Sequence, residues 1–422
     1  MLVALSLTAI ATIPYEEAIR LWRGGEAIWI DSPRNALPSW VNRFPGVNLP
    51  ETILVPSPDP ADRTVTEYAD GGRDVAFALA FDYPYGDFPS EIALVLDASY
   101  AERQPLVSLT WVRPDGRRIA LGEQPAGRST RYSISQDQRL SQRLSDLPPE
   151  AGLFARRGTE DEPQVLPGRY QLEVEALLFE PASDLAARLV VYGKAHGLAG
   201  TDHRRRDLSI ALLWGTPIAL LFGLLAAVAS SCISLFIAAG GVWHGGWLDA
   251  TIQRITEVNA ILPALPILIL VTTFYSQSLW VILAVVILLS IFGLGIKFFR
   301  AFFLQVLDAP YIEAARAYGA GSGRIVFHYM IPRVLPVLIP GFVTAIPAFV
   351  FLETSLAFLG LGDPNLPTWG KVLNDAYQNG ALYKGYHYWV LQPAVLLMMT
   401  GLSFALVGFA LDRIFNPRLR VR

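Results

Sequence analysis

The sequence has little with which to build covalent cross-links or metal sites. Its 422 residues include a single cysteine, Cys232, which excludes an intrachain disulfide and offers no metal-ligand spacing. The five histidines are scattered singly, so we expect no metal ion and no bound cofactor. The formal net charge is −3, with no dense basic cluster away from the ends of loops, which argues against nucleic acid as a partner.

A phosphate-binding loop for ATP is missing as well. The glycine-rich stretch 319–323 follows a helix-favouring segment instead of a strand, and it lacks the Lys-Ser/Thr pair of a Walker A motif. No other segment of the sequence offers this motif. We therefore expect a chain without catalytic residues that is not itself an enzyme, and we expect any ATP hydrolysis that drives it to take place on another chain.

Long apolar runs are absent from residues 30–200 but recur after them. The mean hydropathy of +0.37 is high for a soluble protein, and only 17% of the residues are charged. Runs of about 20 residues or more, the length that crosses a bilayer, lie at about 208–239, 255–275, 279–303, 334–361 and 389–411. The sequence predicts an α-helical polytopic membrane protein with a large water-facing insert.

Residues 1–22 allow two interpretations. The apolar stretch 1–14 is shorter than the roughly 20 residues of a full span. A signal peptide would carry a basic n-region and a small-residue cleavage site, and neither is present. The other interpretation is a first transmembrane helix, short or truncated, that continues into 15–22. We favour the helix, which brings the total to about six spans.

Residues 30–195 have the pattern of a β-rich domain. Apolar stretches of strand length at 75–81 and 92–96 are bounded by turn residues. The segment 113–116 is a hairpin signal, and 169–179 alternates apolar with polar residues. Short strands separated by turns predict a sandwich-like fold. A proline-dense lead-in precedes the strands, and 139–147 favours a short helix.

The basic residues of the short loops predict the orientation. Arginines at or near the ends of spans are Arg300, Arg316, Arg324, Arg333, Arg413, Arg418, Arg420 and Arg422. Because cytoplasmic loops carry the excess of Lys and Arg, we place the loop around 300–333 and both termini in the cytoplasm. Residues of about 30–200 are then extracytoplasmic. The cluster 204–206 opposes this assignment, but Asp202 and Asp207 partly offset it.

A polar, glycine-punctuated stretch at 311–340 separates two apolar runs. Residues 312–318 favour a helix, and the glycines that follow break it. The residues that form a pattern here are Glu313, Ala314, Ala315, Gly319, Ile331 and Pro332. An isolated Glu-Ala-Ala triplet is common in any helix, but this spacing between two spans resembles the EAA loop of ABC-importer permeases, at about 308–332.

That resemblance implies a short cytoplasmic coupling helix that docks on an ATPase subunit. Glu313 would pair with a basic group, either on the partner or on its own loop. Gly319 would let the chain reverse sharply and permit a close backbone approach. The same resemblance implies a type I ABC importer permease fold.

Further segments resemble the dipeptide/oligopeptide/nickel family of these permeases, and its second permease type in particular. The matching residues are Gly200, Thr201, Asp202 and Asp207, then Gly246, Trp247 and Asp249, then Gly360, Gly362, Trp369 and Gly370, with 416–420 similar to the family's ending. Arg205 replaces a signature glycine, which puts the tight turn expected there in question. Lys297 and Glu257 also depart from the family pattern. The resemblance covers about 197–422.

The resemblance implies a subunit of an assembly in the cell membrane. Its partners would be a homologous second permease, two ATPase subunits and an extracytoplasmic solute-binding protein, within the lipid bilayer. The transported solutes would be peptides or similar small molecules. The insert would dock the binding protein or cap the partner permease, or else be a passive spacer.

Glu353 is a carboxylate well inside an apolar run. Ionisable groups in a bilayer face a partner or a watery cavity by default, so Glu353 is a candidate for the translocation pathway or for a subunit interface. A different class of function stays open for the chain, that of a membrane-anchored receptor whose ectodomain does the work. An exporter is disfavoured, since the EAA pattern belongs to importer-type permeases.

Overall fold

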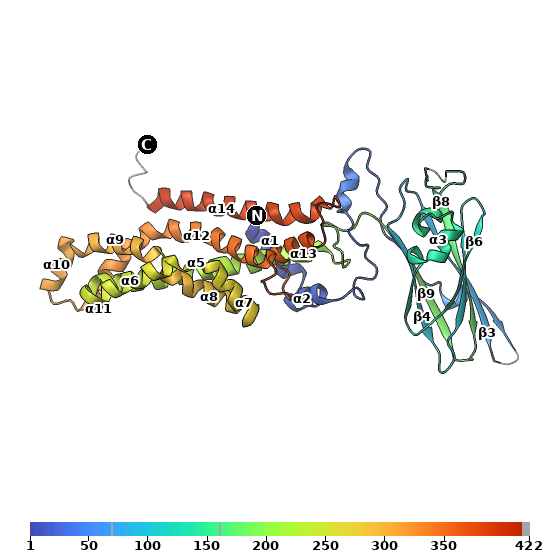
Figure 1. Cartoon of the computed structure of the whole chain (residues 1–422), viewed down its shortest axis with the longest axis horizontal. Coiled ribbons are helices and arrows are strands. Elements are labelled where there is room, and N and C mark those ends of the chain that lie inside the picture. Colours follow the sequence, from blue (N-terminus) through green and yellow to red (C-terminus); the bar gives the residue numbers. More distant parts are fainter. Residues whose placement is uncertain (69–70, 160–161, 416–422) are drawn as a thin grey trace. The chain divides into compact units, whose positions relative to one another are not determined.

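The computed structural model describes residues 1–68, 71–159 and 162–415 of the chain. The chain divides into two compact units (Figure 1). A helical unit is formed by Met1–Arg23 together with Ile210–Arg422, and a β-rich unit by Gly24–Ser209. The β-rich unit is thus inserted between the N-terminal helices and the remainder of the helical unit.

The described part of the β-rich unit holds two antiparallel sheets. The first runs in the order β1 (Ile53–Val55), β9 (Asp184–Tyr192), β4 (Glu91–Ser99) and β7 (Thr130–Ser133). The second runs in the order β2 (Thr64–Glu67), β3 (Arg73–Tyr83), β8 (Gly168–Leu178), β5 (Leu106–Val112) and β6 (Arg118–Pro125). Short helices connect them, namely η1 (Ser39–Arg43), η2 (Pro60–Asp62), η3 (Ile134–Gln136), α3 (Gln138–Arg143) and α4 (Pro149–Gly152).

The inner faces of the two sheets share one apolar core. In β8, the alternation that marks the strand in the sequence buries Tyr170, Leu172 and Val174, because successive side chains of a strand point to opposite faces. The ring of Tyr170 lies 4.5 Å from that of Phe154 and 5.9 Å from that of Trp111. Two sheets around one core form a sandwich-like arrangement.

Two local predictions for this unit are refined by the structure. The hairpin turn expected at 113–116 is present, with Gly116 at φ +79° and the Arg113 N–H donating to the Arg117 carbonyl at 3.0 Å. The helix expected at 139–147 is shorter, because α3 ends at Arg143 and α4 begins separately at Pro149. Asp137 begins α3 as its N-cap and accepts from two backbone N–H groups.

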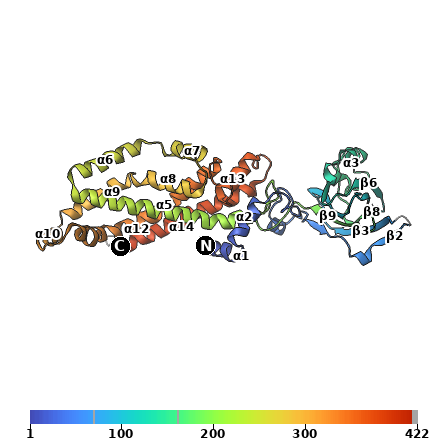
Figure 2. The same cartoon turned by 90° about the horizontal axis from the view of Figure 1, so that it is seen from below.

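The helical unit is drawn from two viewpoints in Figures 1 and 2. Its N-terminal helices are α1 (Leu2–Thr12) and α2 (Tyr15–Arg23). The others are α5 (Leu208–His244), α6 (Gly246–Ile261), α7 (Ala264–Phe274), α8 (Leu279–Ile291), α9 (Gly295–Leu307), α10 (Pro310–Ala317), α11 (Ser322–Arg324), η4 (Ile325–Met330), α12 (Ile331–Phe358), α13 (Trp369–Gln378) and α14 (His387–Phe415).

Among the described residues, α5, α12 and α14 are each long and apolar enough to cross a membrane. The sequence predicted continuous helices at 255–275 and 279–303, and this prediction is wrong. Each stretch instead belongs to a pair of helices with a sharp bend between them. The bend is 75° between α6 and α7 and 45° between α8 and α9. At the first break, Leu262 is extended before Pro263, as the residue before a proline prefers.

The N-terminal segment is also bent. Helices α1 and α2 meet at an angle of 84°, so the helix expected to continue through 15–22 turns at Pro14. Ile13 adopts an extended conformation there, again as expected before proline.

Helix α13 lies in the 362–388 segment, where a loop was expected from the sequence. Thr368 caps α13 by accepting from the Lys371 N–H at 3.3 Å.

Candidate functional site

Helix α10 carries the Glu-Ala-Ala triplet, and its C-terminal end explains the glycine that follows. Gly319 adopts φ +77°, which favours glycine because a Cβ is strained in the left-handed region. The Gly319 N–H donates to the Arg316 carbonyl and the Ala320 N–H to the Ala315 carbonyl, both at 3.0 Å. This pair of bonds is a Schellman motif. The predicted sharp reversal is confirmed. The expected close backbone approach is not seen within this chain, because a Cβ on Gly319 would meet nothing within 4 Å.

One face of α10 is anchored and the other is exposed. Ile312 is fully buried and joins an apolar cluster with residues of α5, α9 and α12. Ala315 packs against the same cluster, while Glu313 and Ala314 are exposed. Tyr318, which ends the helix, is 92% exposed. The helix is therefore held on one side by the bundle, and its other side is a mixed polar and apolar surface that is exposed in this chain.

Glu313 forms no ion pair with any residue that the structure describes, so its own loop does not supply the expected basic partner. The guanidinium of Arg316, one turn along the helix, lies 4.7 Å over the ring of Trp243 instead, a cation–π geometry. The Glu313 carboxylate thus stays available to a group outside the chain.

The chain returns from α10 to the bundle through α11 and the π-helical turn η4. Ile331 is 8% exposed and packs in the same cluster as Ile312. Pro332 stands in the first turn of α12, where its missing N–H removes one hydrogen bond from an otherwise continuous helical path. Of the six residues of the EAA-like pattern, Ala315 and Ile331 thus pack in this cluster, whereas Glu313, Ala314, Gly319 and Pro332 are exposed.

The second motif forms the turn between α5 and α6. Gly245 and Gly246 have φ angles of +61° and +54°, so the reversal uses two consecutive glycines. Asp249, in the first turn of α6, accepts from Arg300 of α9 at distances from 2.6 to 3.0 Å. Trp247 is 79% exposed and marks the end of the unit where this turn lies.

The two departures from the family pattern in this region lie beside each other. Lys297 Nζ is 3.6 Å from Glu257 Oε1, and both side chains are partly exposed. Lys297 of α9 thus has a carboxylate partner, Glu257, on α6.

The third motif packs α13 against α12. A Cβ on Gly370 would lie 2.5 Å from the Ala357 Cβ and 2.6 Å from the Thr354 carbonyl oxygen, so only glycine fits at this distance. Trp369 is buried and its Nε1 donates to the Leu212 carbonyl of α5 at 3.1 Å. Gly360 turns the chain after α12 with φ +81°, and a Cβ on Gly362 would also meet Ala357.

The segment 200–207 closes the β-rich unit. The Thr201 hydroxyl donates to the Pro33 carbonyl at 2.7 Å and accepts from the Ala36 N–H at 3.0 Å, so it holds the proline-dense lead-in. Asp202 is fully buried and pairs with Arg206 at 2.6 Å. Asp207 Oδ1 accepts from the Ser209 N–H at 2.8 Å and caps the start of α5. The Gly200 carbonyl accepts from the Leu208 N–H at 3.0 Å.

Arg205 keeps the turn that the signature glycine would have made. Its φ is +68°, and its N–H donates to the Asp202 carbonyl at 3.1 Å. The arginine therefore adopts the backbone conformation of a glycine, and the turn in question is present. Its fully buried guanidinium pairs with Glu91 of β4 and lies 4.3 Å over the Tyr192 ring. The sequence analysis did not identify Glu91 and Tyr192. Its only signal for this contact was that Arg205 replaces a signature glycine.

Glu353 lies on α12 and is 3% exposed. The Thr354 hydroxyl is 3.4 Å from its Oε2. Within this chain the carboxylate is enclosed, which favours a role inside the bundle over one on an open pathway. No group of three or more His, Cys, Asp or Glu residues within the described residues is arranged to hold a metal ion.

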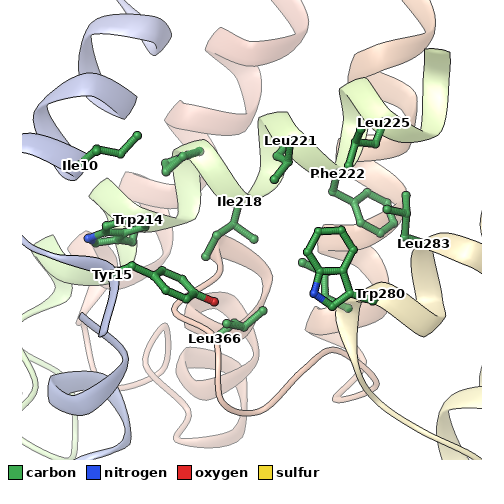
Figure 3. A pocket seen from close by; sticks show the side chains of 12 residues that line it. Ile10, Tyr15, Trp214, Ile218, Leu221, Phe222, Leu225, Trp280, Leu283 and Leu366 are labelled. Carbon is green, nitrogen blue, oxygen red and sulfur yellow. The ribbon is translucent and has the colours of Figure 1, made fainter. Parts of the chain in front are cut away.

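An apolar cavity of about 590 Å³ lies in the helical unit (Figure 3). Side chains of α1, α2, α5 and α8 surround it, among them Tyr15, Trp214 and Trp280. Trp214 Nε1 donates to the Ile13 carbonyl at 3.2 Å, which fixes the bend between α1 and α2. The lining carries no charged group, so the cavity offers space but no acid–base chemistry.

Residues 230–421 match the family described as "Binding-protein-dependent transport system inner membrane component". The matched region includes α10, the Gly246–Asp249 turn, Glu353 and the α12–α13 contact, whereas segment 200–207 and the β-rich unit precede it. Within the matched region, α12 and α14 are long and apolar enough to cross a membrane.

Relatives carry the names of peptide-type permeases. The chain is 31% identical over 232 residues to the peptidoglycan transport system permease protein YejE of Agrobacterium fabrum. The aligned region covers 53% of this chain and 58% of that protein. The chain is 28% identical over 222 residues to the dipeptide transport system permease protein DppC of Bacillus subtilis, covering 52% and 68%. The MetNI methionine ABC transporter is a solved structure with 20% identity and a TM-score of 0.39, covering 49% of this chain and 96% of that one.

Proposed function

We propose that the chain is a transmembrane permease subunit of an ATP-driven ABC importer for peptides or similar small solutes. The observation that carries the proposal is the anchored but exposed helix α10 within a region that matches a binding-protein-dependent transport family. The printed names of the relatives, which include peptidoglycan and dipeptide permeases, support the substrate class. The receptor alternative lacks a comparable supporting observation.

The packing beneath α10 suggests how force would pass into the bundle. Ile312 shares one apolar cluster with Val242 of α5, Phe303 of α9 and Val334 of α12. Since packed interiors are dense and transmit displacement, a shift of α10 imposed by an ATPase subunit would move these helices together. The Asp249–Arg300 pair adds a charged link between α6 and α9 at 2.6 Å.

The proposed assembly contains a homologous second permease, two ATPase subunits and an extracytoplasmic binding protein. In it, α10 and both termini face the cytoplasm, and residues of about 30–200 lie on the opposite side. The helical unit then crosses the membrane about six times, with each bent helix pair counted as one span. This proposal rests on the arginine bias of the loops.

We also propose that the β-rich unit makes contact with the binding protein or the partner permease. Its lead-in and the segment after β9 expose apolar side chains, with Trp40 43%, Phe44 58% and Leu198 80% accessible. Trp40 Nε1 donates to the Leu198 carbonyl at 3.1 Å, so the three residues form a defined patch, and aromatic patches of this kind are typical of interfaces. Deletion of about 35–190 tests this proposal: unchanged uptake by a fully assembled transporter would contradict it.

The coupling role is tested by Glu313→Ala in the reconstituted transporter. Uptake falls and ATP hydrolysis loses its dependence on the binding protein, because the ATPase contact at α10 is weakened. Glu16→Ala is the matched control, since Glu16 is also an exposed carboxylate in the first turn of a short helix. If both variants transport like the native chain, the coupling role of Glu313 is contradicted. If the native assembly supports no uptake at all, the permease proposal fails and the receptor interpretation is favoured.

A further inference from the structure

A recess rich in arginine lies in the β-rich unit, away from segment 200–207 and from the motifs of the helical unit. It is formed by the β5–β6 hairpin, the end of α3 and the segment that follows α4. Its lining includes Arg113, Arg117, Arg143, Arg156 and Arg157. The recess has a volume of about 60 Å³ and adjoins a wider hollow of about 780 Å³ that shares Arg117, Arg156 and Arg157.

Arg113 forms the floor of the recess. It is 4% exposed, donates to the Ala155 carbonyl and lies 3.3 Å from the Asp115 carboxylate. Its buried Nε has no hydrogen-bond partner among the described residues. Because an unused donor on a buried charged group is costly, a guanidinium with a free N–H at the floor of a recess suggests an absent acceptor.

The other arginines surround this floor with further donors. Arg143 is held in place by the Ala120 and Leu121 carbonyls, at 2.7 and 3.3 Å. The side chains of Arg117, Arg156 and Arg157 are exposed and have no ion pair with any described residue. Among the described residues, Asp115 is the acidic side chain that lines the hollow, so arginines outnumber acidic groups in the part of the lining that the structure describes.

Some arginines elsewhere in the same unit have carboxylate partners. Arg131 binds Glu91 at 3.1 Å, and Arg188 binds Asp31 at 2.6 Å. Arg118, next to the recess arginine Arg117 in the sequence, forms its own ion pair with Glu173. Arg103 and Arg169, outside the recess, form no ion pair with a described residue either. What distinguishes the recess is therefore the gathering of five arginines in one lining.

We propose that this recess binds an oxyanion, namely a phosphate or carboxylate group. The planar guanidinium presents its N–H donors in a fork that matches the oxygens of either group. The narrow recess takes the anionic group itself, and the adjoining hollow leaves room for the molecule that bears it. The anion satisfies the Nε of Arg113 and offsets the excess charge.

The test uses the full chain in nanodiscs of zwitterionic lipid, titrated with inorganic phosphate and, separately, with succinate. The double variant Arg117→Gln with Arg157→Gln removes two exposed donors without touching the core. It binds phosphate or succinate at least about tenfold more weakly than the native chain, and added salt weakens the native binding. The matched control is Arg103→Gln with Arg169→Gln, two exposed arginines outside the recess, which leaves binding unchanged.

Competition with a soluble, short-chain phosphatidic acid distinguishes the sources of the oxyanion. Displacement of phosphate by this lipid assigns the recess to headgroups, and failure to displace it assigns the recess to free anions or to carboxylates of soluble molecules. The proposal is overturned if neither phosphate nor succinate binds the native chain, or if the recess variant and the control bind equally. Equal melting temperatures of the two variants show that both are folded.

Discussion

Arg205 and Glu91 form an ion pair between positions 114 residues apart in the chain. The arginine side chain is completely buried, while the carboxylate, 14% exposed, also accepts from Arg131 at 3.1 Å. The pair joins segment 200–207 to the first residue of β4 inside the β-rich unit. Arg205 occupies the left-handed backbone conformation, which is disfavoured for a residue with a side chain. The contacts of its guanidinium must therefore outweigh the backbone strain.

Arg205→Gly tests which of these two effects dominates. Loss of one partner of a buried pair costs about 3–5 kcal/mol, and relief of the left-handed backbone offsets about 1 kcal/mol. We expect the free energy of unfolding of the β-rich unit to fall by about 2–4 kcal/mol, measured by denaturant titration of the full chain. Arg204→Ala, at an exposed neighbouring position, should have little effect. A more stable Arg205→Gly variant would show that backbone strain outweighs the contacts of the guanidinium.

Gly319→Ala should weaken the C-terminal end of α10 without creating a clash. At φ +77° a side chain costs about 1 kcal/mol, and the added Cβ meets nothing within 4 Å. We expect faster amide hydrogen exchange at 318–320 and reduced coupling of ATP hydrolysis to uptake. Gly323→Ala is the control, since that glycine has open space and no positive φ. Identical exchange in both variants would contradict a role for the left-handed conformation.

Gly370→Ala should separate α13 from α12. The new Cβ would lie 2.5 Å from the Ala357 Cβ and 2.6 Å from the Thr354 carbonyl oxygen, and such overpacking costs about 1–3 kcal/mol. We expect a lower melting temperature in detergent. The added change Ala357→Gly should rescue it only in part, because the carbonyl contact persists. Gly341→Ala, a glycine of α12 with open space, should be tolerated, and equal melting of both single variants would refute the close approach.

Glu180 should contribute to the acid stability of the β-rich unit. The backbone N–H groups of Ala101, Arg103 and Glu102 donate to its carboxylate, and they lower its pKa from 4.5 to about 2. A lowered folded-state pKa gives stability that is present above the unfolded value and is lost as the pH falls through the folded value.

The melting temperature as a function of pH measures this contribution. Glu180→Gln should melt below the native chain at neutral pH, and the difference should shrink as the pH falls from 4.5 towards 2. Glu175→Gln, at an exposed position of β8, serves as the control. A difference that stays constant over this range would mean that the carboxylate charge does not matter.

Local patterns in the sequence predicted the elements that local chemistry determines. The alternation in 169–179 located β8, and the Glu-Ala-Ala helix followed by a glycine located α10 and its Schellman end. The bends at Pro14 and Pro263 carried a proline signal, yet whether an apolar run with a proline stays straight depends on its neighbours. Helix α13 was missed because its packing against α12 depends on the space that Gly370 leaves.

The candidate site divides in the same way. The sequence by itself determined helix α10 and the glycine after it, the absence of a nucleotide-binding loop and the apolar runs, since each depends on residues that are close along the chain. Only the tertiary structure decided that Ile312 anchors α10, that Arg205 keeps a glycine-like turn and that five arginines line one recess. Those properties depend on contacts between distant residues, which the folded chain brings together and which no local pattern records.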